Sequence, residues 1–310
     1  CQFMPDAVAY CQTIRSDSGE RYQLALVRVG MPLEKGELEQ AADTLRICIN
    51  IWGRQSGTDA VNELVRAILQ DEPLRMRRLA GIFHIDIASI HELWLFCGTD
   101  AGKVKKHMKE YCELMRQYAD TVFGAVFEGM PVMCLSTPHS LRETEKVMVG
   151  MIADMRAVWP DAVIVRCCGL NNTTDCRRAY LTVLDALEDV RNIFPDRCLV
   201  LQGELEFAAE CRKLIDGGED AAMRSLAPLT ALKSDSESGD LLETVCTYLL
   251  DCDGSVTKTA GKLFLHRNTI KYRLQRITDM LGHHPAKMPE MMGLYRSAAV
   301  YRLLVASKET

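Results

Sequence analysis

The chain has 310 residues, of which 48% are hydrophobic and 25% are charged. This composition is that of a globular protein and excludes a disordered or collagen-like chain, and the length exceeds what one core usually holds. No apolar run reaches the roughly 18 residues that span a bilayer, and residues 1–6 do not resemble a signal peptide. Thirteen cysteines without regular spacing favour buried thiols over a disulfide framework. We therefore expect two or three domains, no membrane span and a cytoplasmic location.

The net charge of −5 is unevenly distributed along the chain. Residues 241–310 carry 10 Lys and Arg against 6 Asp and Glu, and thus +4, whereas the preceding 240 residues carry 27 against 36, and thus −9. Within the C-terminal part, residues 256–278 contain six basic side chains and no acidic one. A local basic surface on an acidic body is typical of a phosphate-binding module attached to a regulatory domain.

The N-terminal part begins with two predicted strands, at 8–14 and 22–30, joined by the turn-rich segment 15–20. A helix is predicted at 35–52 from its apolar spacing. Because two strands and one helix cannot enclose a core alone, we interpret residues 1–57 as part of a sensory domain, with the tail of a GAF-like domain as the hypothesis.

The central part, residues 58–233, alternates between helix and strand patterns. Helices at 59–70 and 73–83 lead into it. The elements expected next are a strand at 91–97, a helix at 103–118, a hairpin of strands 122–127 and 132–135, a helix at 141–158, a strand at 162–167, a helix at 174–193, a strand at 198–202 and a helix at 205–215. Strand, helix, hairpin, helix, strand is the order of a ferredoxin-like sandwich, so the sequence predicts an α+β central domain.

The C-terminal part, residues 241–310, follows a small polar segment at 234–240 that predicts a linker. Helices are predicted at 241–250, 256–263 and 267–281, with Ser255 as an N-cap and Gly282 as a stop, and a last helix at 290–304. The helix at 267–281 has a predicted buried stripe of Ile270, Leu274, Ile277 and Leu281. A short helix, a three-residue turn and a longer basic helix predict a helix-turn-helix in an all-α domain.

The second helix of this pair presents polar side chains away from its buried stripe. Asn and Gln can pair with adenine, whereas Lys and Arg can bind guanine or phosphate. Arg273 lies nearer the buried edge, where a phosphate contact and an intradomain ion pair are both open; His266 is interpreted as a cap, and Tyr272 as a base contact or a packing residue. The expected DNA-binding residues are Thr257, Lys258, Lys262, Arg267, Asn268, Thr269, Lys271, Tyr272, Arg273, Gln275 and Arg276.

The segment T-K-T-A-G-K-L-F-L-H-R-N-T-I-K-Y-R-L-Q-R-I at 257–277 resembles the C-terminal DNA-binding domain of PucR-type regulators, the purine-catabolism and sugar-diacid (CdaR) regulator group. The signature of that group is T-A-x-x-L-(F/Y)-x-H-R-N-T-x-x-Y-R-L, and the resemblance extends over 241–304. It implies a bacterial transcriptional regulator, often an activator, which responds to a small metabolite through upstream domains. It also implies a degenerate GGDEF-like domain before the DNA-binding module.

Double-stranded operator DNA is therefore the expected partner. Because one such module contacts few base pairs, we further expect a homodimer or higher homo-oligomer on a two-part operator. The effector, the operator sequence and the sense of regulation stay open.

No catalytic site, metal or cofactor is expected. A working GGDEF enzyme needs a Gly-Gly-acid-Glu turn, whereas the hairpin here offers Glu128-Gly129-Met130-Pro131. Cys167, Cys168 and Cys176 fit no usual zinc spacing. The alternatives are a signalling enzyme or nucleotide-binding receptor that uses the central domain, and an oligomerisation scaffold.

Overall fold

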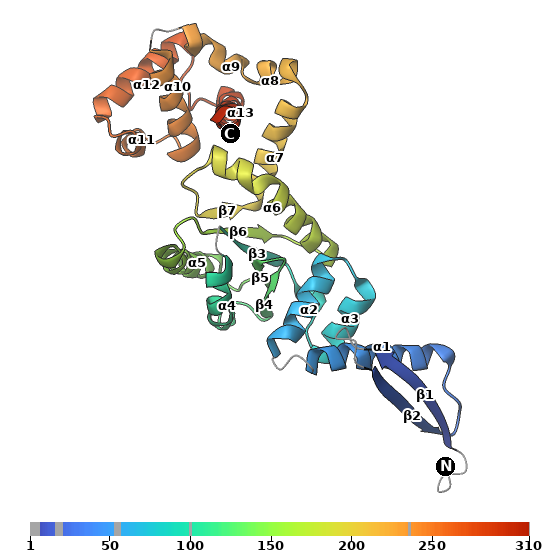
Figure 1. Cartoon of the computed structure of the whole chain (residues 1–310). Coiled ribbons are helices and arrows are strands. Elements are labelled where there is room, and N and C mark those ends of the chain that lie inside the picture. Colours follow the sequence, from blue (N-terminus) through green and yellow to red (C-terminus); the bar gives the residue numbers. More distant parts are fainter. Residues whose placement is uncertain (1–6, 16–20, 53–56, 99–100, 235–236, 310) are drawn as a thin grey trace.

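The computed structural model describes residues 7–15, 21–52, 57–98, 101–234 and 237–309, so most of the predicted turn at 15–20 lies outside it. The molecule is elongated (Figure 1). A two-stranded ribbon lies at one end, a five-stranded sheet occupies the middle and the C-terminal helices form the other end.

The N-terminal ribbon consists of β1 (Ala7–Arg15) and β2 (Arg21–Val29), which pair antiparallel. One face packs against α1 (Lys35–Trp52), where Ile14, Leu24 and Ala42 form a small core. Side chains alternate between the faces of a strand, so Val27 and Val29 lie on the opposite face and are exposed. The predicted elements are thus present, while their assignment to a GAF-like domain stays a prediction.

The central sheet has the strand order β4-β5-β3-β6-β7. Its strands are β3 (Glu92–Cys97), β4 (Val122–Phe127), β5 (Met130–Leu135), β6 (Val163–Cys168) and β7 (Leu199–Leu201). β3 is antiparallel to both β5 and β6, and β7 adds parallel to β6. The run β6-β3-β5-β4 has the order and directions of a ferredoxin-like sheet, and the α+β class is confirmed.

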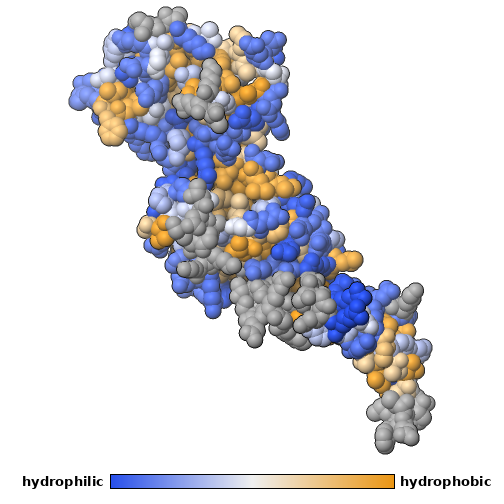
Figure 2. All heavy atoms as spheres, viewed as in Figure 1, coloured by the Kyte–Doolittle hydropathy of each residue, from blue (hydrophilic) through white to orange (hydrophobic). Residues whose placement is uncertain are grey.

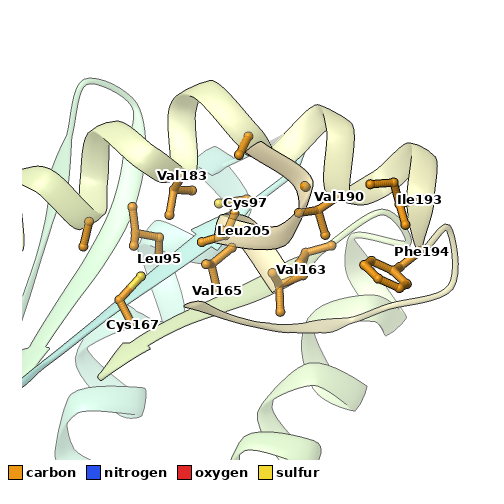
Figure 3. Close-up of a cluster of buried hydrophobic side chains, with 14 of the residues drawn as sticks. Leu95, Cys97, Val163, Val165, Cys167, Val183, Val190, Ile193, Phe194 and Leu205 are labelled. Atoms are coloured by element: carbon orange, nitrogen blue, oxygen red, sulfur yellow. The ribbon is translucent and has the colours of Figure 1, made fainter. Parts of the chain in front are cut away.

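Helices cover both faces of this sheet, which makes β3 a buried central strand. On one face Trp94 and Phe96 pack with α4 and α5; on the other Leu93 and Leu95 pack with α2, α6 and α7. Figure 3 shows this second face, where Leu95 lies near the α6 side chain Val183. The helices are α2 (Gly57–Leu69), α3 (Pro73–Phe83), α4 (Ala101–Met115), α5 (Leu141–Val158), α6 (Thr173–Ile193) and α7 (Gln202–Asp216), with the short 3-10 turn η1 (Ile87–Ser89) before β3. Each fully buried large apolar side chain contributes about 1.5–3 kcal/mol.

The hairpin between β4 and β5 is tighter than predicted. Its turn consists of Glu128 and Gly129, with φ of +48° and +85°, and β5 already begins at Met130. Two left-handed residues in a row are the pattern of a type I′ turn, whose twist matches that of the strands. Pro131 therefore lies in β5, paired with Val126, and not in the turn as expected.

Residues 219–246 differ from the sequence expectation. They form α8 (Glu219–Ser225), α9 (Ala227–Thr230), the 3-10 turn η2 (Ala231–Ser234) and α10 (Ser238–Cys246), of which α8 and α9 were not predicted. Within the predicted linker 234–240, residues 235–236 lie outside the described residues, and residues 238–240 are the first turn of α10. Their polar composition suggested a linker, but Asp240 and the preceding Glu237 form ion pairs with basic side chains farther along the chain.

Candidate nucleic-acid interface

The predicted helix-turn-helix is present near the C-terminus. α10 continues into the π-helical segment η3 (Thr247–Asp251), and α11 (Val256–Lys262), α12 (Arg267–Leu281) and α13 (Glu290–Glu309) follow. Ser255 caps α11 by accepting a hydrogen bond from the Lys258 backbone N–H at 3.4 Å. Gly282 ends α12 in the left-handed conformation, with φ of +76°, as the sequence predicts.

The buried side of α12 fixes its orientation against α10 and α11. Ile270, Leu274 and Ile277 are buried, as predicted, whereas Leu281 is only partly buried. Ala260 on α11 is also buried. A small side chain lets the two helices approach closely where they pack. The opposite side of α12 is consequently left to solvent.

The exposed side of α12 carries a polar surface that we name the open face: Arg267, Asn268, Lys271, Tyr272 and Gln275. Among the described residues, no hydrogen bond or ion pair involves the side chains of Arg267, Asn268 or Lys271. Tyr272 is 60% exposed. Gln275 donates from Nε2 to Asp279 Oδ1 at 2.8 Å. Thr269 is only partly buried beside this surface, and Thr257 is exposed in the first turn of α11.

His266 lies at the N-cap of α12. Its Nδ1 accepts a hydrogen bond from the backbone N–H of Asn268 at 3.2 Å. The interpretation of His266 as a cap is confirmed. The contact also holds the first turn of α12, where Arg267 and Asn268 lie, in a defined conformation.

Other basic residues that were expected to bind DNA are engaged within the protein. Arg273 is 12% exposed; it donates from Nη1 to Thr244 Oγ1 at 3.2 Å and from Nη2 to Asp240. Of the two roles open for Arg273, the structure shows the intradomain ion pair. Arg276 Nη1 lies 2.9 Å from Glu237 Oε2. Lys258 pairs with Asp253 at 3.2 Å, but both side chains are 64% exposed, and such pairs stabilise little.

Lys262 lies at the junction with the central domain. Its Nζ forms ion pairs with Asp196, which follows α6, and with Asp251 at 3.1 Å. Burial alone would lower the pKa of Lys262, but hydrogen bonds to both carboxylates raise it. We name Lys262, Arg273 and Arg276 the tethered cations, because each is held by a carboxylate of the protein.

Arg302 of α13 completes this junction. Its Nη2 lies 2.6 Å from Asp251 Oδ2, and its Nη1 donates to the Ile193 carbonyl at 2.5 Å. Burial would raise the pKa of Asp251, but Arg302 and Lys262 lower it, so the carboxylate is held ionised. The helix-turn-helix is therefore anchored to the end of α6 by a shared network.

The cysteines near β6 differ in their burial. Burial raises the pKa of Cys167 and of Cys176 to about 12, so both remain thiols that pack in the core, while Cys168 is exposed. Within the described ranges no group of three or more His, Cys, Asp and Glu side chains is placed to hold a metal ion. None of the helices in those ranges is both long and apolar enough to cross a membrane.

Sequence reasoning missed one exposed residue in this region. Phe264, in the turn between α11 and α12, is 95% exposed and has a φ of +54°. An aromatic residue at the point where a helix ends was the available signal, since glycine or asparagine usually occupies such a left-handed position.

Comparisons with known proteins agree with the geometry of this region. Residues 241–300 match the family of the PucR C-terminal helix-turn-helix domain. Uncharacterized proteins of Mycobacterium bovis and Mycobacterium tuberculosis are each 38% identical over 91 residues, which cover 27% of this chain and 22% of theirs. The chain thus spans about a fifth of the length of these relatives.

A solved structure, a regulator of polyketide synthase expression from Bifidobacterium adolescentis, covers 80% of this chain and 99% of its own, with 17% identity and a TM-score of 0.32. A score this low does not establish a shared arrangement of the whole chain. The family match and the described helices together identify residues 241–300 as a PucR-type C-terminal helix-turn-helix domain.

Proposed function

We propose that the protein is a sequence-specific DNA-binding transcriptional regulator that docks α12 in the major groove. The open face is the observation that carries this proposal. It combines an amide, two unpaired cations and an exposed tyrosine at the N-terminal half of the second helix of a helix-turn-helix. That half of the helix meets the base edges when such a motif docks on DNA.

The residues of the open face divide by the contacts they can make. The Asn268 side chain can pair bidentately with adenine, and its backbone is already fixed by His266. Arg267 and Lys271 can bind guanine or phosphate. Thr257 lies outside the open face, in the first turn of α11, and its exposed hydroxyl can donate to a phosphate. The tethered cations are left out of this interface, since each already has a partner.

We further propose that the regulator responds to a small metabolite in the cytoplasm, as an activator like many regulators it resembles. A cavity of about 380 Å³ between α2, α4 and β4 supports an effector site in the central domain. Its lining residues include Asn62, Lys109 and Phe123, together with Arg116 and Glu113, which form an ion pair, so apolar surface lies beside charged groups of both signs. We propose that this domain is a degenerate GGDEF-like domain that serves dimerisation or sensing and has no catalytic activity.

A dimer or higher homo-oligomer on a two-part operator remains part of the proposal. Two modules in one assembly raise the effective concentration of the second half-site, so both can be held although each binds weakly. Two-fold symmetry would place the half-sites about 10 base pairs apart or at a multiple of that spacing.

The experiment is selection of duplexes from a random-sequence pool by the full chain, followed by measurement of the Kd for the selected duplex and for a scrambled one. We expect the selected duplex to bind at least about 10³-fold tighter at physiological salt. Equal affinities would contradict sequence-specific regulation. Light scattering of the complex gives the stoichiometry, and one protomer on one unrepeated site would contradict the oligomer.

A further inference from the structure

Phe264 lies in the turn of the helix-turn-helix with its ring in solvent. The flanking residues Leu263 and Leu265 are partly buried and pack on the core, whereas Phe264 is 95% exposed. The Leu265 backbone N–H bonds to the Ala260 carbonyl at 3.0 Å and so closes the end of α11. Figure 2 shows apolar surface at the end of the helical region where α11 turns into α12.

The fold itself gains nothing from a phenylalanine at this position. Its φ of +54° lies in the left-handed region, where a side chain with a Cβ is strained and glycine is not. An exposed ring also keeps its apolar surface in water instead of burying it. Two unfavourable features at one residue indicate that the ring serves a contact outside the chain.

The surroundings of Phe264 indicate the chemistry of that contact. Residues 254–278 contain no acidic side chain, and Arg267 follows three positions after Phe264. Consecutive Cα atoms are about 3.8 Å apart, so the two Cα atoms lie within about 11 Å of each other. A partner that presents apolar atoms beside negative charge would suit both Phe264 and Arg267, and the deoxyribose rings of a DNA backbone offer this combination.

We propose that Phe264 packs against a sugar of the duplex, at the wall of the groove that α12 enters, and fixes the depth of docking. This inference rests on the proposed function. The ring carries no charge, so it adds affinity without releasing a counterion. It complements Arg267 and Lys271, whose phosphate contacts depend on salt.

The test compares Phe264→Asn, Phe264→Tyr and wild type in the full chain on the duplex selected from the random pool. Asparagine tolerates the left-handed backbone and removes the ring, so the fold should be kept and the thermal midpoint should not fall. We expect Phe264→Asn to weaken binding about five- to tenfold with an unchanged salt slope. Phe264→Tyr should bind within twofold of wild type.

Met292→Asn on α13 is the matched control, because Met292 is 59% exposed in the same domain and lies outside the turn. Its affinity should equal that of wild type. If wild type binds the selected duplex and Phe264→Asn binds equally well, the sugar contact is wrong and the ring serves another partner. If wild type itself does not distinguish the selected from the scrambled duplex, the proposed function fails instead.

Discussion

The open face and the tethered cations both contain lysine and arginine side chains in one small domain, yet the surroundings of these cations differ. Arg267 and Lys271 lie in solvent without a carboxylate partner in the described chain. Lys262, Arg273 and Arg276 are each held by an acidic residue. These acidic partners lie outside residues 256–278, the segment without an acidic side chain. They are Asp240 on α10, Asp251 on η3, Glu237 before α10 and Asp196 after α6. The number of basic residues in a sequence segment therefore does not give the number of DNA contacts.

This difference assigns separate tasks to the two groups. Unpaired cations can neutralise phosphates without first breaking a bond, whereas a tethered cation would have to give up its partner. The tethered cations instead hold α11 and α12 against α10 and the central domain. Substitutions should therefore separate DNA affinity from stability.

The largest expected effect is a loss of stability when the ion pair between Arg302 and Asp251 is broken. Arg302→Ala removes the charged hydrogen bonds of Arg302 to Asp251, whose side chain is 4% exposed and keeps only Lys262 as an ion-pair partner among the described residues, and we expect a loss of about 3 kcal/mol. Urea unfolding should show the loss. Arg296→Ala, an exposed arginine on the same helix, is the control and should change stability by less than about 0.5 kcal/mol. Similar losses for both variants would contradict the anchoring role.

The next largest expected effect is on the affinity and the sequence preference of DNA binding. Asn268→Ala should lower the affinity for the selected duplex by about 1–3 kcal/mol and relax the preference at one base pair. Repeating the selection from a random pool with this variant shows which position loses its preference. An identical selected sequence would exclude Asn268 from base contact.

Lys271 and Arg273 are two residues apart and allow a direct comparison. Lys271→Ala should lower the slope of log affinity against log salt by about one, with unchanged stability, because it removes a phosphate contact. Arg273→Ala should keep the slope and lower stability by about 1 kcal/mol, since it removes charged hydrogen bonds to a partly exposed partner. The measurements are the salt dependence of the DNA affinity and the unfolding curve of each variant. If Arg273→Ala lowers the salt slope and Lys271→Ala lowers the stability, the two roles are the reverse of those proposed.

The smallest expected effect is at the junction. Asp196 is 74% exposed, so its pair with Lys262 should contribute less than about 1 kcal/mol. Asp196→Asn releases one of the two partners of Lys262, and we expect a gain in DNA affinity of at most a few fold at low salt. Glu188→Gln serves as a control for removing one negative charge. If Asp196→Asn binds DNA more weakly than wild type, the proposal that Asp196 restrains Lys262 is contradicted.

Much of the architecture follows from local patterns in the sequence. The strands and helices of the central domain were predicted from their apolar patterns, and α12 ends at Leu281 with Gly282 as its left-handed cap, as the glycine predicts. The predicted hairpin turn, 128–131, is two residues longer than the observed one because proline favours turns, although proline is also tolerated at the start of a strand. Helices α8 and α9 are short and lack a long apolar period, which explains why they were not predicted.

The sequence predicts the secondary-structure elements better than it predicts the partners and exposure of the side chains on them. Helical geometry places Asn268 and Lys271 outward, and the structure agrees. Asp196, one of the two partners of Lys262, lies 66 residues away, and Glu237, the partner of Arg276, lies 39 residues away, a separation that no local pattern reveals. Phe264 was missed because its exposure depends on one backbone angle in a turn.

The last helix, α13, joins the two halves of the molecule. Its Tyr295 ring lies 5.3 Å from that of Phe207 on α7, and Ser297 donates to the Ser225 carbonyl at 2.6 Å. Buried residues of α6, α7 and α13 form one continuous core with those of the sheet. The C-terminal module and the central domain should therefore melt cooperatively. A ligand that raises the melting temperature of the sheet would also protect the DNA-binding helices from unfolding.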